Sequence, residues 1–313
     1  MTPSSGWDAR QLGSQTGRTF VVTGANSGIG LETSRELVRR GAHVVLAVRD
    51  TAKGEQAKAD VLSSGGQGRA SVLELDLADL HSVATAAKEL TETHPSLQGL
   101  IANAGVMAGP LALTAQGFER QVGTNHLGHA ALVSALWPQL TSAAGRVVLV
   151  SSIAARGGRL SATSTRDDLV APAVYRPQVV YSNSKQANLL FAQELHRRVV
   201  AAGSPVSVVA AHPGVSSTAL FTRTLREHRL KPLVPVAELV MKLALQPASA
   251  GALATLRALD PSTPSGAFVG PSSLGQTRGR PELLEVYSTG SDPAVAARLW
   301  ELTEELLGAP LLP

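Results

Sequence analysis

The chain has 313 residues, of which 44% are hydrophobic and 17% are charged. This composition is typical of a globular protein, and the length allows one large domain or two small ones. No cysteine is present, which excludes disulfides, thiolate metal sites and cysteine nucleophiles. The net charge of +4 is dispersed along a chain with only 4% aromatic residues, so a slightly basic enzyme is favoured over a nucleic-acid-binding protein.

Targeting and metal-binding signals are missing from the sequence. Residues 1–18 lack a basic-then-apolar signal pattern, and no run of about 18 apolar residues suggests a membrane span. We therefore expect a cytoplasmic protein with no membrane span. His126 and His129 are spaced to share a helix face, but no HExxH pattern or third ligand accompanies them, so no metal site is predicted.

Short β-rich apolar runs alternate with stretches of helical periodicity as far as about residue 212. Strands are predicted at 19–23, 43–48, 70–75, 99–102, 146–151, 206–211 and 267–270. Helices are predicted at 29–40, 53–62, 80–93, 116–140, 180–201 and 293–307. This alternation predicts an α/β fold in one domain over residues 1–313, with a doubly wound parallel sheet of about seven strands and helices on both faces, of the Rossmann type.

Two regions interrupt the alternation. Residues 153–178 are rich in Gly, Ser and Arg and read as an insertion. Residues 215–250 are apolar but are broken by Pro232, Pro235 and Pro247, which predicts short helices around a pocket. This second region is interpreted either as a mobile apolar cover over a hydrophobic substrate or as an ordinary packed subdomain.

A glycine-rich turn follows the first predicted strand and opens the first helix. It reads Thr-Gly-Ala-Asn-Ser-Gly-Ile-Gly over residues 23–30. Gly24 permits a tight turn, Gly28 lets the backbone approach a pyrophosphate, and Gly30 lets helix and strand pack closely. The helix start supplies N–H donors for phosphates. The turn therefore predicts a dinucleotide site, with contacts from Gly24, Asn26, Ser27, Gly28, Ile29 and Gly30.

The end of the second predicted strand should set the cofactor preference. Proteins that bind NAD place an acidic residue there, on the adenosine ribose. Here Val48 occupies that position, and Arg49 follows it. A guanidinium can chelate a 2′-phosphate that an acid would repel, so NADP(H) is favoured over NAD(H). The alternative is that Asp50 takes the ribose position, although Asp50 also suits the N-cap of the next helix.

Tyr181 and Lys185 lie four residues apart in a predicted helix, so they share a face. The other two tyrosines, Tyr175 and Tyr287, have no such lysine partner. A nearby ammonium favours phenolate and is expected to lower the pKa of Tyr181. Such a pair can exchange a proton with a carbonyl or an alcohol.

Together these residues resemble the short-chain dehydrogenase/reductase family over about residues 18–218. The resemblance assigns Asp76 and Leu77 to the adenine, and Asn103, Ala104 and Gly105 to the cofactor-binding NNAG segment, whose first Asn is replaced by Ala102. It makes Asn125, Ser152, Tyr181 and Lys185 the catalytic set. It also places Pro213, Gly214, Val215 and Thr218 beside the nicotinamide.

Within the family, the chain is most similar to the branch of retinol dehydrogenases and protochlorophyllide reductases. The long interval from Ser152 to Tyr181 and the sequence that follows Lys185 carry this resemblance. It implies hydride transfer between NADP(H) and a ketone, an aldehyde or an alcohol, which we expect to be lipophilic. Tyr181 would protonate the alkoxide, Ser152 would hydrogen-bond it, Lys185 would bind the ribose, and Asn125 would hold a water.

Other readings stay open at this point. An epimerase or dehydratase of the same family would use the cofactor transiently, and a non-catalytic NADP(H) sensor would need only the glycine-rich turn. Many family members pair their two long central helices, here at about 116–140 and 180–201, into a dimer. A homodimer is therefore expected as well, unless the inserted segment covers that face.

Overall fold

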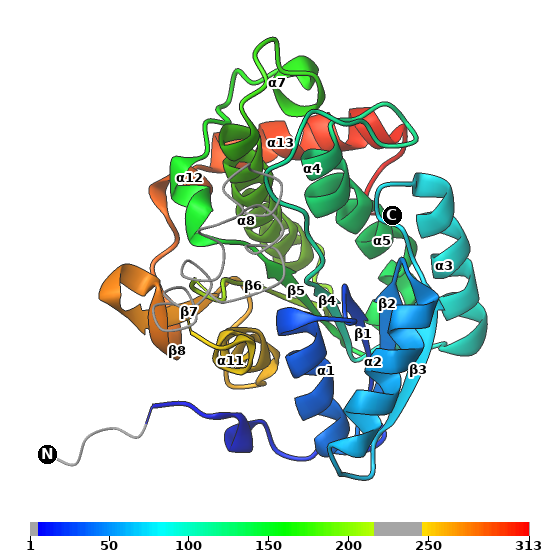
Figure 1. Ribbon diagram of the computed structural model, residues 1–313. Helices are drawn as coiled ribbons and strands as arrows, with labels where there is room; N and C mark the ends of the chain where they lie inside the picture. The colour runs from blue at the N-terminus through cyan, green and yellow to red at the C-terminus, as the bar shows by residue number, and fades with distance from the viewer. Residues whose placement is uncertain (1–5, 216–245, 313) are drawn as a thin grey trace, which may run out of the picture.

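The strands form one sheet in which each pair is parallel until the last. A computed structural model describes residues 6–215 and 246–312. The sheet order is β3-β2-β1-β4-β5-β6-β7-β8 (Figure 1). Its strands are β1 Thr19–Thr23, β2 His43–Val48, β3 Arg69–Glu74, β4 Gly99–Ala102, β5 Arg146–Val150, β6 Ser207–Ala211, β7 Phe268–Ser273 and β8 Arg278–Leu284. The reversal of order between β1 and β4 is that of a doubly wound sheet, so the predicted fold class is confirmed.

The sequence predicts about seven strands, whereas the sheet in the described part of the chain has eight. The strand predicted at 267–270 is β7, and it continues to Ser273 before a hairpin leads into antiparallel β8. The sequence of β8 is Arg-Gly-Arg-Pro-Glu-Leu-Leu, and most of its residues are exposed. Pro281 fits an edge strand, where the missing N–H costs little. Such a strand lacks the apolar run by which the buried parallel strands were predicted.

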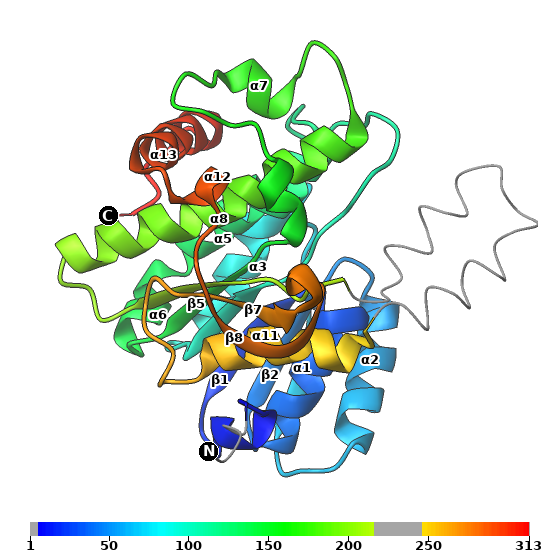
Figure 2. The same cartoon turned by 90° about the vertical axis from the view of Figure 1, so that its left-hand side faces the viewer.

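Helices cover both faces of the sheet (Figure 2). One face carries α1 Gly28–Arg39, α2 Thr51–Ser63 and α11 Ala248–Leu259, with the short η1 Ala9–Leu12 beside α11. The other carries α3 Leu80–Thr93, α5 Gly128–Ala135, α6 Trp137–Ser142 and α8 Pro177–Ala201. Each face has its own apolar core, one including Leu37, Val44 and Ile101 and the other Leu100, Leu149 and Leu190.

The helix predicted at 116–140 is broken into segments. It begins with α4 Arg120–Val122, passes through a π-helical turn, η2 Gly123–Leu127, and continues as α5 and α6. Pro138 lies in the first turn of α6, the position that proline tolerates best. A single π turn inside a helix often marks a functional site, and this one contains Asn125.

The segment 153–178 interrupts the alternation, as the sequence suggests, but it contains ordered elements. The 3-10 helix η3 Ile153–Gly157 follows β5, and α7 Arg166–Val170 begins with a capping box between Thr165 and Asp168. The helix carrying Tyr181 then begins at Pro177, three residues before the predicted 180. Most of the region predicted as a cover, 215–250, lies outside the described residues; its end, 246–250, leads into α11.

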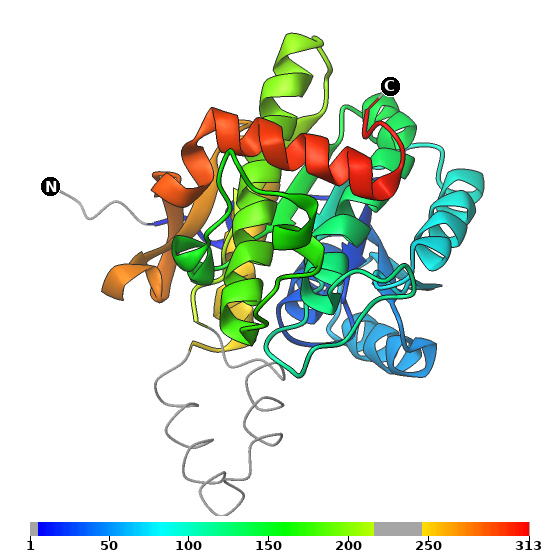
Figure 3. The same cartoon turned by 90° about the horizontal axis from the view of Figure 1, so that it is seen from above.

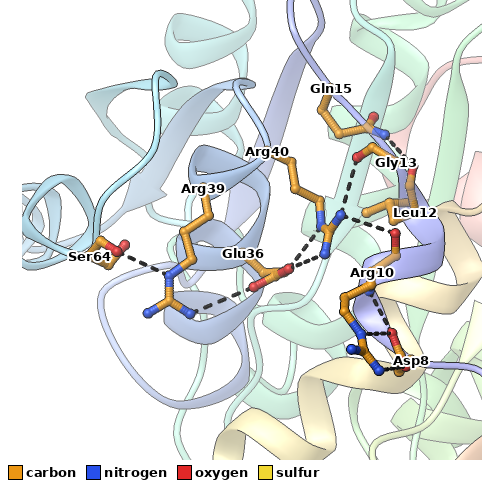
Figure 4. Close-up of polar contacts among 9 residues, drawn as sticks. All are labelled: Asp8, Arg10, Leu12, Gly13, Gln15, Glu36, Arg39, Arg40 and Ser64. Atoms are coloured by element: carbon orange, nitrogen blue, oxygen red, sulfur yellow. Dashed lines mark hydrogen bonds and ion pairs between the residues drawn. The ribbon is translucent and has the colours of Figure 1, made fainter.

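The two chain ends pack onto the domain from different sides. Near the N-terminus, the Arg40 guanidinium at the end of α1 donates to the carbonyls of Arg10 and Gly13 and contacts Glu36 (Figure 4). Near the C-terminus, α12 Ser288–Ser291 leads into α13 Pro293–Leu307, which lies across α8 (Figure 3). Within the described part of the chain, every helix is too short or too polar to cross a membrane.

Candidate active site

The glycine-rich turn leaves β1 at the carboxyl edge of the sheet and enters α1. Gly24 has φ of 65° and Gly28 has φ of 57°, in the left-handed region that favours glycine. A Cβ on Gly30 would lie 2.6 Å from the Gly24 carbonyl oxygen and 2.5 Å from Asn103 Nδ2. Glycine is therefore required for α1 to pack this closely against the strand ends.

The first turn of α1 presents unsatisfied donors beside this loop. Ser27 is the N-cap residue, but its side chain makes no capping hydrogen bond, and it is exposed. Asn26 and Ile29 on either side are partly exposed. The free Ser27 hydroxyl and the amides of the helix start therefore suit a phosphate group.

At the end of β2, the structure separates the two residues that compete for the ribose position. Asp50 is the N-cap of α2 and accepts a hydrogen bond from the Lys53 amide at 3.1 Å. Its carboxylate also lies 2.7 Å from the Lys53 ammonium, and the Lys53 side chain lowers the pKa of Asp50. Arg49 is exposed and makes no hydrogen bond or ion pair with the described residues. The guanidinium is thus the group available to a ligand.

The ends of β3 and β4 lie on either side of β1 at the same edge. Asp76 follows β3, and its Oδ1 accepts the Ala78 amide at 2.9 Å. Leu77 is buried, and α5 packs so closely on it that a Cβ on Gly128 would meet its carbonyl oxygen. Beyond β4, Asn103 donates from Nδ2 to the Thr23 carbonyl at 2.8 Å.

Ala104 and Gly105 continue this segment toward the catalytic side chains. The Ala104 amide donates to Thr23 Oγ1 at 2.9 Å. A Cβ on Gly105 would lie 3.3 Å from Asn125 Oδ1 and 3.4 Å from Lys185 Nζ. Ala102, which replaces the first Asn of the family motif, is buried in the core, so the substitution leaves the strand end in place.

Tyr181 and Ser152 are neighbours in the site. Ser152 follows β5 and is the N-cap of η3, where its Oγ accepts the Ala154 amide at 3.2 Å. Tyr181 is 8% exposed, and the Ser152 side chain lies near enough to its phenol to affect its pKa. Burial raises the pKa of Tyr181, and the Ser152 side chain lowers it in part. The expectation of a lowered pKa is wrong in direction, because desolvation of the buried phenol raises the pKa of Tyr181 and is the dominant effect.

Lys185 is buried, and its ammonium contacts a backbone carbonyl. Its Nζ donates to the Val150 carbonyl at 3.1 Å, and its own carbonyl accepts the Ser151 hydroxyl at 2.7 Å. Desolvation lowers the pKa of Lys185 to about 8. A buried ammonium with a perturbed pKa beside a buried tyrosine is the kind of group found at active sites.

Asn125 is held from three directions. Its Oδ1 accepts the Val106 amide at 2.8 Å, and its Nδ2 donates to the Val106 carbonyl and to Ser184 Oγ, both at 2.9 Å. Ser184 in turn donates to the Tyr181 carbonyl at 2.7 Å. The amide of Asn125 therefore connects the loop after β4 to the helix that carries Tyr181.

The turn after β6 completes the site. Gly214 has φ of 71°, and the Val215 amide donates to the Thr277 carbonyl at 2.8 Å. The tip of the β7–β8 hairpin thus holds the turn that begins with Pro213. Thr218, the last cofactor contact expected from the sequence, lies outside the described residues.

The structure brings the four expected catalytic side chains and the cofactor segments to one edge of the sheet. Sequence reasoning missed the residues that hold them: Ser184 on Asn125, Ser151 on Lys185 and the Thr23 hydroxyl under residues 103–104. Ser184 stands inside the Tyr181-to-Lys185 motif, and this position could have drawn attention to it. Thr23 begins the glycine-rich motif and Ser151 precedes Ser152, so their positions offered a similar signal.

Comparison with known proteins agrees with the resemblance to the short-chain dehydrogenase/reductase family. The model of the family described as short chain dehydrogenase matches residues 18–164. Human retinol dehydrogenase 11 is 43% identical over 65% of this chain, and the match spans 63% of the human protein, less than two thirds of its length. Mouse retinol dehydrogenase 14 is 36% identical over 93% of this chain and 86% of its own length.

Solved structures agree with these matches. An uncharacterized protein from Mycobacterium Paratuberculosis is 42% identical, covers 99% of this chain and 100% of its own, and superposes with a TM-score of 0.79. A structure described as an NAD(P) dependent gluconate 5-dehydrogenase from Beutenbergia cavernae, with NADP bound at low occupancy, is 25% identical over 81% of this chain and 91% of its own, with a TM-score of 0.59. This chain belongs to the short-chain dehydrogenase/reductase family of oxidoreductases, in its retinol dehydrogenase-like branch.

Proposed function

We propose that the protein is an NADP(H)-dependent oxidoreductase that interconverts a lipophilic ketone or aldehyde with its alcohol. The observation that carries this proposal is the buried Tyr181 phenol, whose pKa responds to the Ser152 side chain, with Lys185 and Asn125 next to Gly105. A cofactor sensor would have no need of this arrangement. The names of the retinol dehydrogenase relatives support the oxidoreductase reaction and an apolar substrate.

The residues at the edge of the sheet fit a nicotinamide dinucleotide. Ser27 and the α1 amides would bind the phosphates, Gly24 and Gly28 have the positive φ of a phosphate loop, and Asp76 keeps one carboxylate oxygen beyond its Ala78 contact. The dinucleotide, when bound, supplies or accepts the hydride. The remaining chemistry falls to the side chains.

Tyr181 and Ser152 would act on the substrate oxygen. In reduction, the Tyr181 hydroxyl gives its proton to the developing alkoxide while the Ser152 hydroxyl donates a hydrogen bond to the same atom. These donors interact most strongly with charge that is present near the transition state, so they lower the barrier rather than only binding substrate. The raised pKa of Tyr181 keeps its proton in place at neutral pH, as a proton donor requires.

Lys185 and Asn125 would support the phenol. The buried Lys185 ammonium favours the phenolate that forms when Tyr181 gives up its proton, and Lys185 is proposed to bind the nicotinamide ribose. Asn125 is proposed to hold the water through which the proton is replaced. Both protons of its side-chain amide are already donated, to Val106 and Ser184, so that water would donate to an Asn125 acceptor, and the backbone carbonyl, which can accept a second bond beside that from His129, is proposed for this role.

Arg49 supports the preference for NADP(H) over NAD(H). Its guanidinium lies at the end of β2 without a partner among the described residues, whereas the Asp50 carboxylate is engaged by Lys53. A free guanidinium is suited to bidentate contact with a 2′-phosphate. The NADP-bound relative from Beutenbergia cavernae supports this choice only at the level of the family.

Two further features remain proposals from the sequence. The cytoplasmic location is one of them. The homodimer through the long central helices is the other, and any such contact would have to form around α13, because Trp300 of α13 stacks on Phe191 of α8 and Thr303 bonds His126.

The deciding experiment is a panel of carbonyl compounds assayed with NADPH and with NADH. We expect NADPH oxidation with medium- and long-chain aldehydes or cyclic ketones, and loss of turnover in Tyr181→Phe with cofactor binding nearly unchanged. Product formed without net NADPH consumption would favour an epimerase or dehydratase. Cofactor binding with no turnover of any carbonyl or alcohol would favour a sensor.

A further inference from the structure

The side chain of His129 connects the cofactor loop to Asn125. His129 lies in the first turn of α5, one helical turn after Asn125, and is 1% exposed. Its Nδ1 lies 2.9 Å from the Asn125 carbonyl oxygen, and its Nε2 lies 2.9 Å from Thr23 Oγ1. Thr23 ends β1 and immediately precedes Gly24 of the glycine-rich turn.

The directions of these hydrogen bonds follow from the chemistry of the partners. A carbonyl oxygen only accepts, so Nδ1 carries the ring proton. Burial and the Lys185 charge lower the pKa of His129 to about 4, so the ring is neutral and Nε2 is a bare acceptor. Thr23 must then donate its hydroxyl proton to Nε2, because its other acceptor, the Ile101 carbonyl, is farther away at 3.3 Å.

The Thr23 oxygen is also an acceptor, which extends the chain of hydrogen bonds. The amides of Asn103 and Ala104 both donate to it at 2.9 Å. The bonds therefore run in one direction, from the segment after β4 to the Thr23 hydroxyl, then to His129, and finally to the Asn125 carbonyl. Every donor and acceptor in this buried chain is satisfied, as buried polar groups require.

We infer that His129 is a positioning residue, which fixes the Asn125 backbone relative to the cofactor-binding ends of β1 and β4. The inference rests on the proposed function, in which residues 103–105 contact the cofactor and the Asn125 carbonyl holds a water. One aromatic ring contacts both parts of the site, so a shift in either is transmitted to the other. A side chain of similar size without hydrogen-bonding groups would fill the space but lose this connection.

His126 offers a matched control on the same helix. It is also 1% exposed, its pKa is lowered by burial to about 3, and it bonds Thr303 of α13 at 2.9 Å. It contacts neither the cofactor loop nor the Asn125 backbone in any hydrogen bond of the described residues. Replacing each histidine by Phe thus removes one buried imidazole in either case, but only His129→Phe disconnects the site.

The test compares the wild type with His129→Phe, His126→Phe and His129→Gln. Three quantities are measured: the NADPH dissociation constant by fluorescence, kcat and KM with the best carbonyl compound of the panel, and the thermal midpoint. We expect His129→Phe to weaken NADPH binding roughly three- to ten-fold and to lower kcat roughly ten-fold or more, the scale of lost hydrogen bonds. His126→Phe should lower the thermal midpoint but leave the NADPH dissociation constant and kcat within about two-fold of the wild type.

His129→Gln should restore most of the loss, since an amide also offers one donor and one acceptor. Equal functional losses in the two Phe variants, or a loss of thermal stability alone in His129→Phe, would show that His129 is only a core residue. If His129→Phe does not fold, Thr23→Val against Thr23→Ser asks the same question: the Val variant should lose NADPH affinity and kcat, and the Ser variant should keep them. Wild type that binds NADPH but reduces no carbonyl would end the proposed function, while the NADPH affinities would still test His129.

Discussion

Asp50 and Lys53 form a closed pair at the start of α2. The Asp50 carboxylate accepts the Lys53 amide at 3.1 Å and lies 2.7 Å from the Lys53 ammonium. Asp50 caps the helix, and its negative charge complements the positive end of the helix dipole. An acidic residue engaged in this way is a poor ligand for a ribose, and the adjacent Arg49 is left as the group proposed to select the cofactor.

The first prediction follows from this pairing. Arg49→Ala should weaken NADP(H) binding by about 1–3 kcal/mol, the scale of charge-assisted hydrogen bonds, and should barely change NAD(H) binding. Titration of both cofactors in their reduced forms measures the two affinities. Asp50→Asn is the control, because Asn also caps helices well and should leave both affinities nearly unchanged.

The outcomes separate the two residues. Equal losses for both cofactors in Arg49→Ala would contradict contact with the 2′-phosphate. A selective loss of NAD(H) affinity in Asp50→Asn, with tighter NAD(H) than NADP(H) binding in the wild type, would show that Asp50 sets the preference.

The second prediction concerns the hydroxyl pair of Tyr181 and Ser152. The Ser152 side chain lowers the pKa of Tyr181 against the stronger effect of burial. Ser152→Ala should therefore raise this pKa further. In the alcohol-oxidation direction, where Tyr181 must first lose its proton, the rise of kcat/KM with pH should move to higher pH, in addition to a lower maximum.

A pH profile of alcohol oxidation that extends from about pH 7 to at least about pH 11, above the usual tyrosine pKa, makes the measurement. Tyr175, whose hydroxyl bonds the Gly109 carbonyl at 3.1 Å, supplies the control. Tyr175→Phe removes a partly buried phenol without touching Ser152, so its profile should match the wild type. A profile of unchanged position in Ser152→Ala would contradict the assigned role of that hydroxyl.

Five of the parallel strands, β1, β2, β4, β5 and β6, could be predicted from sequence because each is an apolar run that is almost wholly buried. The limits of β1, β2 and β4 agree with the predicted 19–23, 43–48 and 99–102. Burial of a strand at a sheet centre leaves a strong composition signal. β8 left none, since its residues are mostly exposed and its pairing is decided by the hairpin after β7.

The candidate site also has residues that could be predicted from sequence and residues that could not. The ends of successive strands could be expected to converge, so the residues after β1, β4, β5 and β6 could be named from their positions in the sequence. The residues that hold these side chains in place could not be named, because the contact of Asn125 with Val106 depends on the path of the loop after β4.

The pKa of Tyr181 illustrates a different limit of sequence-based prediction. The spacing to Lys185 predicts a lowering, but burial, which no spacing shows, acts in the opposite direction and dominates.

The third prediction follows from the buried ammonium of Lys185. Burial lowers its pKa from 10.5 to about 8. Below about pH 8 the group is charged in both the folded and the unfolded chain, and burying the charge destabilises the fold. Between about pH 8 and 10.5 the folded chain has lost this proton while the unfolded chain still binds it, so this contribution to the free energy of unfolding rises with pH.

The measurement is denaturant unfolding of the wild type and Lys185→Met at several pH values. Relative to the Met variant, the wild type should gain roughly 2–3 kcal/mol between about pH 7 and 10.5. Lys88, exposed on α3, provides the control, since Lys88→Met should leave the pH dependence unchanged. A constant difference between wild type and Lys185→Met across this range would show that Lys185 is not buried as a charge.

The fourth prediction concerns Gly214, in the turn proposed to border the nicotinamide. Its φ is 71°, and a Cβ there would meet the Thr277 carbonyl and lie 2.9 Å from Gln246 Nε2 and from Pro271 Cγ. Gly214→Ala should therefore be destabilised both by left-handed backbone strain and by crowding against the β7–β8 hairpin. We expect its free energy of unfolding to fall by about 2–3 kcal/mol. Because the turn must shift to relieve the crowding, NADPH affinity should fall as well.

Gly203 separates these two effects. Its φ is 61°, but nothing lies within 4 Å of a Cβ built on it. Gly203→Ala should therefore show only the backbone cost, about 1 kcal/mol, with NADPH affinity unchanged. Chemical denaturation and NADPH titration of both variants make the comparison. Equal losses of stability in the two variants would contradict crowding by the hairpin. A Gly214→Ala variant that binds NADPH like the wild type would show that the position of this turn does not affect the cofactor site.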